Sequence, residues 1–203
     1  DVYKRQQRQE GRLSGVTVCI DAGHQENGRF VNEPIGPGLT GSTSGKGGMA
    51  QGTKTNRRES IVCLEIGMLL RDELLRQGAN VVMTREDQTT FHTNIERCEI
   101  AEAGGAQIML RLHCNNSSNR SKRGIQVYGP LNSDYAKAVA DADTYREMGQ
   151  KLLDAMKTRV GMTLANSTGM VRLNDNYVGN NWAKMMCCLL YTSPSPRDKR
   201  QSR

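Results

Sequence analysis

Apolar positions recur along this chain with two different periods, which together predict alternating strands and helices. The stretch at residues 16–25, VTVCIDAGHQ, alternates as far as Ile20 and then enters a turn at Gly23, which is typical of a strand that ends in a glycine turn. Residues 107–112, QIMLRL, repeat this strand-like pattern. Shorter strands are predicted at residues 80–84 and 124–128, and a last one begins within residues 185–190.

Between these strands, apolar residues fall at helical spacing. Residues 59–77, ESIVCLEIGMLLRDELLRQ, predict a helix with Gly78 just past its end. Further helices are predicted at residues 93–103 and over most of residues 133–160. This order of elements predicts the α/β class, with a twisted, mostly parallel sheet and helices on both of its faces.

The length of 203 residues fits one domain, which we expect to span residues 13–190. Residues 1–12 and 191–203 are expected to be tails, because the second, YTSPSPRDKRQSR, has two prolines and clustered charge and cannot continue a central strand. Residues 26–58 are rich in Gly, Ser, Thr and Pro, and so long a loop is typical of a functional or a mobile segment. A GxGxxG pattern within it opens no helix, which argues against dinucleotide binding.

The net charge of +7 does not indicate nucleic-acid binding, because the two tails carry +2 and +3 and only about +2 remains for the body. No apolar run reaches the roughly 20 residues that cross a bilayer. The chain begins DVYKRQQRQEGR, which has none of the features of a signal peptide. Its six cysteines lack CxxC spacing and do not form a disulfide framework.

A histidine follows each of the two strand-like runs. If these strands are parallel neighbours, His24 and His113 meet at the carboxyl edge of the sheet, where ligands and catalytic groups collect, and a metal ion fits between them. Zinc in hydrolases takes three protein ligands and keeps one position for water, and Glu59, which opens a helix, is the best third candidate. Taken singly, each has a simpler interpretation, such as a histidine in the core or a first-turn glutamate favoured by the helix dipole.

Four other polar residues near these strands each have two interpretations. Asp21 either orients His24 or ends the strand turn. Arg97 and Arg111 either meet peptide carboxylates or are solvated, and Asn115 either borders a substrate groove or ends a loop. We assign Arg97 and Asn115 to substrate binding.

Several short motifs follow one another in a fixed order along the chain. They are IDAGHQ at residues 20–25, a glutamate opening an apolar helix at Glu59, TR at 84–85, ER at 96–97 followed by IA at 100–101, RLHCN at 111–115 and GIQVYG at 124–129. Over roughly residues 15–190 this set resembles the zinc-dependent N-acetylmuramoyl-L-alanine amidases. The insertion ahead of Glu59, with EPIGPG at residues 33–38, is similar to that of amidases from spore-forming and related bacteria.

The resemblance implies an amidase-like fold in which His24, Glu59 and His113 bind Zn²⁺. It implies that the substrate is the amide between N-acetylmuramic acid and L-alanine, that the partners are peptidoglycan and muropeptides, and that the protein works outside the bacterial cell or in its wall. Zinc chemistry then requires a carboxylate base that takes a proton from water and passes it to the leaving amine.

The position of that base is the one departure from the family. In the family the glutamate ends the last strand, shortly after an Asn-Trp pair and an apolar run, so here it should stand at or next to position 191. Tyr191 is there instead, and no glutamate follows Glu147. Both ends of the chain look like translated adapter or vector sequence, so we expect a truncated member that binds zinc without hydrolysis. The alternatives are a natural degenerate homologue and a non-catalytic module of the same fold that binds cell-wall glycopeptide.

Overall fold

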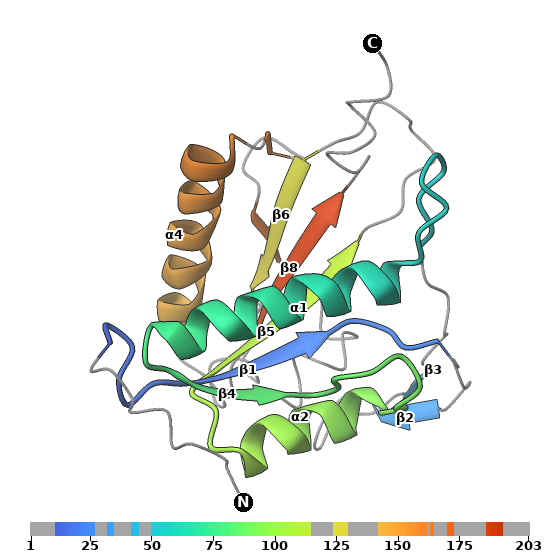
Figure 1. Cartoon of the computed structure of the whole chain (residues 1–203), viewed down its shortest axis with the longest axis horizontal. Coiled ribbons are helices and arrows are strands. Elements are labelled where there is room, and N and C mark those ends of the chain that lie inside the picture. The colour runs from blue at the N-terminus through green and yellow to red at the C-terminus, as the bar shows by residue number, and fades with distance from the viewer. Residues whose placement is uncertain are drawn as a thin grey trace, which may run out of the picture.

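The computed structural model describes residues 11–26, 32–34, 42–44, 50–114, 124–129, 142–161, 163–164, 170–172 and 186–192. In these residues a six-stranded sheet, in the order β4-β1-β5-β8-β6-β7, is covered by helices (Figure 1). The strands are β1 (Thr17–Ala22), β4 (Asn80–Met83), β5 (Ile108–Cys114), β6 (Gly124–Gly129), β7 (Met170–Arg172) and β8 (Met186–Thr192). The helices are α1 (Glu59–Arg76), α2 (Asn94–Ala103) and α4 (Ala142–Val160), and a separate hairpin pairs β2 (Asn32–Pro34) with β3 (Ser42–Ser44).

The sheet is mostly parallel, as the sequence predicts. Strand β1 pairs in parallel with both β4 and β5, and β5 pairs in parallel with β8. Only β6 and β8 run antiparallel to each other. Because Ala22 at the end of β1 pairs with Leu112 near the end of β5, the carboxyl ends of these two strands lie side by side.

Helices cover both faces of the sheet because neighbouring residues on a strand point to opposite sides. On β1, Cys19 packs with Cys98 of α2, whereas Ile20 packs with Cys63 of α1. Leu153 of α4 packs with the buried side chains of β6. The α/β fold class predicted from periodicity is confirmed.

Helix α1 lies close to β1 because Gly67 faces the strand. A Cβ atom at this position would lie 3.4 Å from Ile20 Cγ2 and 3.6 Å from Ala22 Cβ, which leaves room for a methyl group and little more. The helix therefore packs directly on the sheet, with its first turn at the carboxyl end of β1. Helix α2 begins with a capping box between Thr93 and Glu96, which fixes its start near the predicted position.

Two predicted boundaries need correction. Strand β5 continues to Cys114, so His113 lies within the strand and not directly after it. Strand β8 continues to Thr192 between β5 and β6, so the prediction that residues from 191 onward cannot continue a central strand is wrong for the first two of them. The first proline of that segment stands at position 194, beyond the residues that pair with β6.

Some predictions fall where the structure describes nothing. Residues 1–10 and 193–203, which make up most of the predicted tails, lie outside the described residues, as do residues 133–141 of the predicted long helix. None of the helices that the structure describes combines the length and the apolar character that a membrane span requires.

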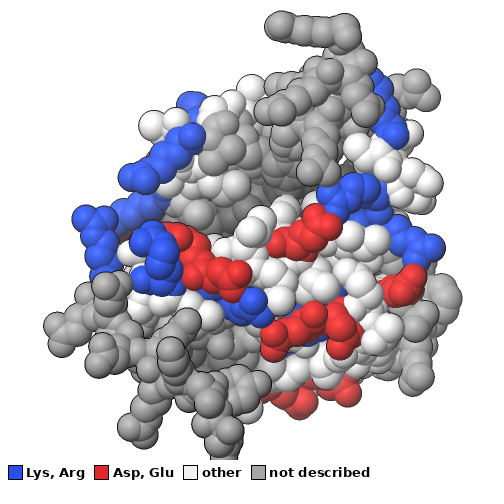
Figure 2. Space-filling view, viewed as in Figure 1, with Lys and Arg blue, Asp and Glu red and all other residues white. Residues whose placement is uncertain are grey.

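Figure 2 shows acidic and basic side chains intermixed on the face that α1 crosses. On this helix Arg71 pairs with Asp72 and Glu86, and Arg76 pairs with Glu73. Among the described residues on this face the two charges are mixed, and the absence of nucleic-acid binding stays a prediction.

Candidate metal centre

Three elements bring the predicted ligands to one point at the carboxyl edge of the sheet. His24 follows β1, Glu59 is the first residue of α1, and His113 is the last but one residue of β5. The backbone of His24 has a φ of 58°, a left-handed conformation that is uncommon for residues other than glycine and turns the chain sharply after the strand. One ligand atom from each of the three residues lies within 4.8 Å of the others.

The Glu59 carboxylate lies between the two imidazoles. Its Oε1 is 3.0 Å from His113 Nδ1 and its Oε2 is 3.2 Å from His24 Nε2, and the ring centroids are 4.8 Å apart. Ligand atoms of a tetrahedral zinc lie about 3.3 Å apart when each metal bond is about 2.0–2.1 Å. Two histidines and one glutamate are also a common catalytic zinc set, so these residues fit a zinc ion in both spacing and chemistry.

Both oxygens of Glu59 are anchored by backbone groups. The N–H of Ala50 donates to Oε2 at 2.8 Å, and the N–H of Cys114 donates to Oε1 at 2.6 Å. Burial alone would raise the pKa of Glu59, but the hydrogen bonds from His113 and His24 outweigh it and hold this pKa well below its usual range. Burial lowers the pKa of His113, so its imidazole is neutral at pH 7. Both groups are therefore in the protonation states that bind a metal.

Arg85 ties the His24 turn to the first turn of α1. Its Nε donates to the carbonyl of Ala22 at 2.8 Å, and its Nη2 donates to the carbonyls of Gly23 at 3.0 Å and Ser60 at 2.7 Å. The side chain is buried, with 2% of its surface exposed. Because His24 follows Gly23 and Glu59 precedes Ser60, one guanidinium fixes the backbone beside two of the three candidate ligands.

A buried carboxylate supports the same turn from the other side. Asp21 accepts hydrogen bonds from Arg97 at 2.5 Å, from Thr84 at 2.7 Å and from Arg111. Burial alone would raise the pKa of Asp21, but the Arg111 and Arg97 guanidinium groups outweigh it and hold this pKa far below its usual range. The guanidinium of Arg97 also donates to the carbonyl of His24 at 3.3 Å. Asp21 therefore supports His24 through Arg97 and not by a contact with the imidazole.

These contacts change the interpretation of the two arginines. Arg97 and Arg111 are buried, with 4% and 3% exposed, so neither is solvated. The guanidinium of Arg97 is occupied by Asp21, by backbone carbonyls and by the Gln25 side chain at 2.5 Å. A guanidinium whose donors are engaged inside the protein is not free to meet a peptide carboxylate. The structure therefore gives no support to the predicted substrate contact of Arg97.

The sequence matches the family described as N-acetylmuramoyl-L-alanine amidase over residues 18–194, which is most of the chain. This protein belongs to the N-acetylmuramoyl-L-alanine amidase family. Among proteins of curated function, none matches the sequence significantly.

Solved structures of amidases share the fold of this amidase. The apo form of Ami1 from Mycobacterium abscessus is 19% identical with a TM-score of 0.71, and the match covers 93% of this chain and 89% of that one. Ami1 from Mycobacterium smegmatis is 19% identical with a TM-score of 0.70, covering 93% and 87%. An amidase from Clostridium difficile 630 is 19% identical with a TM-score of 0.67, covering 96% and 88%. The fold of the chain is thus that of amidases, and the chain is an enzyme of this family by the sequence match.

Glu33, in the insertion ahead of α1, is linked through hydrogen bonds to the buried Arg111. The sequence analysis of this amidase gave Glu33 no role. The Glu33 carboxylate of β2 accepts hydrogen bonds from Asn94 N at 2.6 Å and Asn94 Nδ2 at 2.7 Å. Asn94 Oδ1 in turn accepts one from Arg111 at 3.0 Å. Glu33 and Arg85 both lie inside quoted motifs, EPIGPG and TR, and a charged residue in so short a motif is the signal that could have identified them.

Two further sequence assignments concern the rim of the site. Asn115, assigned to substrate binding, lies outside the described residues. In the backbone register of the amidase, Leu190 pairs with His113 and Tyr191 pairs with Cys114. Position 191, where the family's catalytic glutamate was expected, is therefore on the strand adjacent to a candidate ligand.

Proposed function

We propose that the site of this amidase binds one zinc ion through His24, Glu59 and His113, and that its reaction is hydrolysis of the amide between N-acetylmuramic acid and L-alanine in peptidoglycan. The observation that carries the proposal is the convergence of two imidazoles on one buried, anchored carboxylate. The family match supports peptidoglycan amidase chemistry. This substrate implies a protein that works outside the cell or in the cell wall.

The side chains of the site have separate roles in such a reaction. Zinc, when bound, supplies a Lewis acid for the amide carbonyl and for a water molecule. Glu59 is suited to be a ligand and not the base, because its pKa is low and both of its oxygens already accept backbone hydrogen bonds. Arg85 and Arg97 keep the His24 turn in place by binding its backbone carbonyls. A separate group must therefore accept the proton of the water.

This chain lacks a carboxylate at the position where the family places that group. Tyr191 stands there, and a phenol with an ordinary pKa of about 10 is a poor proton acceptor near neutral pH. We therefore infer that the chain binds zinc and peptidoglycan but hydrolyses its amide slowly. The second candidate function is therefore a module that binds cell-wall glycopeptide without cutting it. It is favoured because the three candidate zinc ligands are present, whereas Tyr191 replaces the expected base.

A glutamate at position 191 tests this division of roles. We expect Tyr191→Glu to raise the release of dye-labelled fragments from stained peptidoglycan by about 100-fold or more, since general-base catalysis contributes about 10²–10⁴-fold. A chelator should abolish the gained activity. The matched control is Thr192→Glu, which adds the same carboxylate at the next position of the strand and should give a smaller gain.

The same assay separates the two functions. Wild-type protein that sediments with insoluble peptidoglycan and releases little dye supports the binding module. Fast, chelator-sensitive release by the wild type would show that another carboxylate serves as base and would refute the role of position 191.

A further inference from the structure

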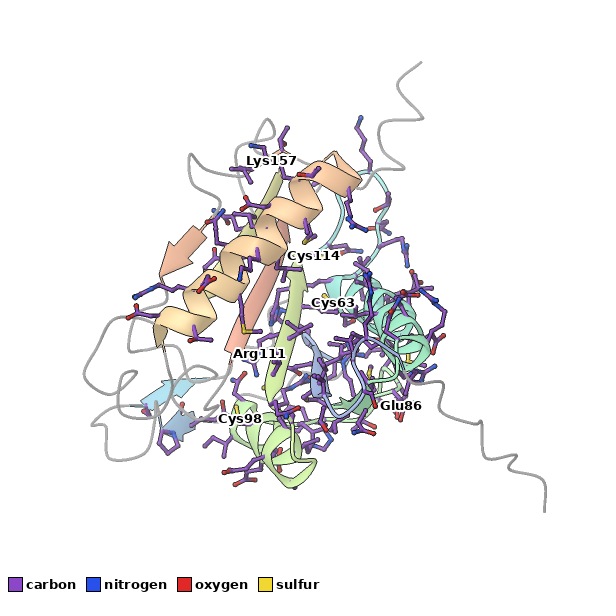
Figure 3. All side chains as sticks on the ribbon, turned by 90° about the vertical axis from the view of Figure 1, so that its left-hand side faces the viewer. Cys63, Glu86, Cys98, Arg111, Cys114 and Lys157 are labelled. Carbon is purple, nitrogen blue, oxygen red and sulfur yellow. The ribbon has the colours of Figure 1, made fainter. Side chains whose placement is uncertain are left out.

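Two free thiols lie against each other directly behind the metal centre. Cys63 is on α1, one helical turn after Glu59, and Cys114 ends β5 next to His113. Both belong to the cluster that packs α1 on the sheet, and Figure 3 shows them at adjacent positions between helix and strand. Cys63 is buried, with 1% exposed, whereas Cys114 is half-buried.

The two side chains are in hydrogen-bonding contact. This hydrogen bond, together with burial, raises the pKa of the Cys63 thiol, which is therefore protonated at neutral pH. The backbone of the same Cys114 donates to Glu59 Oε1 at 2.6 Å. The thiol pair and the carboxylate ligand thus share one residue.

A second pair of cysteines in the chain provides an internal comparison. Cys19 and Cys98 pack in the cluster on the opposite face of the sheet, with 0% and 4% exposed. Burial raises the pKa of each to about 12. Both residues are therefore shielded from solvent, whereas Cys114 is half-buried.

We propose that Cys63 and Cys114 form an oxidation site that closes to a disulfide in the presence of a hydroperoxide, and that this disulfide weakens metal binding by Glu59. The second half of this proposal rests on the zinc site proposed above. The first half depends only on the two thiols.

The chemistry needs one equivalent of hydroperoxide. Its O–O bond breaks as the Cys114 sulfur takes one oxygen and becomes a sulfenic acid, and the rest of the peroxide leaves as an alcohol or water. The Cys63 sulfur then attacks the Cys114 sulfur, the S–O bond breaks, and the hydroxyl leaves as water with the Cys63 proton. Two thiols are oxidised by two electrons, and the peroxide is reduced by two.

Closing the bond moves the backbone that holds Glu59. The S–S bond of a disulfide is about 2.05 Å, so the two sulfurs must approach from hydrogen-bonding distance. We expect this approach to shift the end of β5 or the first turns of α1, since one thiol is on each of these elements. Either shift disturbs the Cys114 N–H that anchors Glu59, and loss of such a partner of a zinc ligand typically lowers metal affinity by about 10- to 100-fold.

The test treats the full chain with hydrogen peroxide, in its zinc-free and zinc-loaded forms, and maps disulfides by mass spectrometry of peptides. Zinc affinity is measured in parallel by competition with a coloured chelator. We expect a Cys63–Cys114 disulfide and a zinc affinity at least about tenfold lower, restored by a thiol reductant. Cys114→Ala should abolish the response to peroxide, whereas the matched control Cys98→Ala should retain it.

Each half of the proposal can fail separately. Absence of the Cys63–Cys114 disulfide, or a Cys19–Cys98 disulfide formed at the same rate, would overturn the oxidation site. A disulfide that leaves zinc affinity unchanged would overturn the coupling to Glu59. Reduced protein that binds no zinc would instead remove the proposed metal centre, and the peptide map would still decide whether the thiols react.

Discussion

At the scale of single residues, the candidate metal centre depends on side chains that hold backbone as much as on the three ligands. The His24 turn has a left-handed residue and no regular hydrogen-bond ladder of its own. Arg85 and Arg97 compensate by donating to three consecutive carbonyls, those of Ala22, Gly23 and His24. Preorganisation of this kind keeps imidazole and carboxylate ligands in a geometry suited to a metal ion.

Arg85 provides the sharpest test of this support. Arg85→Lys keeps the charge but replaces a planar fork with a single ammonium group, which cannot reproduce its divergent bonds to Ala22, Gly23 and Ser60. We expect zinc affinity to fall by about tenfold and the visible spectrum of the Co²⁺-loaded protein to change, because the ligands are displaced.

The control for this variant is Arg76→Lys, whose side chain is exposed in the last turn of α1 and pairs with Glu73. It should leave both the affinity and the Co²⁺ spectrum as they are in the wild type. A normal Co²⁺ spectrum for Arg85→Lys would contradict a positioning role and leave Arg85 a purely structural residue.

The low pKa of Asp21 in the folded protein predicts that the free energy of unfolding depends on pH. Its folded-state pKa lies far below the unfolded value of about 3.9, so its contribution is fully present above about pH 4 and is lost as the pH falls toward the folded value. Asp21→Asn should lower the free energy of unfolding of the metal-free protein by about 3–5 kcal/mol at pH 7, because it leaves two buried guanidinium groups without their carboxylate.

Urea unfolding of the wild type and of Asp21→Asn at pH 7 and pH 3 measures this effect. The difference between the two proteins should be smaller at pH 3 than at pH 7. A difference that is equal at both pH values would show that the ion pairs contribute nothing that depends on the charge of Asp21.

At the scale of elements, the closeness of α1 and β1 decides where Glu59 lies. A Cβ at Gly67 meets Ile20 and Ala22 at ordinary contact distance, so a methyl group fits and a larger side chain does not. We expect Gly67→Ala to be neutral or to stabilise by up to about 1 kcal/mol, through its higher helix propensity. Gly67→Leu should destabilise by about 1–3 kcal/mol through overpacking.

Thermal unfolding of the two Gly67 variants checks this prediction, with zinc affinity as a second measurement. A Leu variant as stable as the wild type would show that α1 can move away from the sheet. If α1 moves, zinc affinity should fall with it, since Glu59 begins the same helix.

The elements themselves could largely be predicted from the sequence, because apolar period distinguishes strands from helices along this chain. Two similar runs that each lead to a histidine support the hypothesis that β1 and β5 are parallel neighbours, and this pairing is confirmed. The predicted end of β8 is wrong, because the charge and prolines of residues 191–203 indicate a tail. Its first two residues, Tyr191 and Thr192, nevertheless pair with β6. Propensity describes a segment by itself, whereas pairing depends on its neighbours.

At the scale of the whole molecule, the sheet gathers residues 24, 59 and 113 because its order places β1 beside β5 and α1 across both. The candidate ligand set could be predicted because each of its residues lies at or near the start or end of a recognisable element. The buried roles of Asp21, Arg97 and Arg111 could not, because charged residues are mostly exposed and only the fold shows that the one carboxylate pairs with both guanidinium groups. The family match and the fold agree on an amidase, whereas zinc and the scissile bond remain proposals.

Zinc stoichiometry tests the central claim most directly. The metal-free chain is equilibrated with a small excess of zinc, freed of unbound metal and analysed by mass spectrometry of the elements, beside His24→Ala, His113→Ala and the control His92→Ala. The account predicts one zinc per chain in the wild type and in His92→Ala, and a loss of bound zinc in the other two variants. Wild-type protein without stoichiometric zinc, or zinc retained after His24 and His113 are replaced, would contradict it.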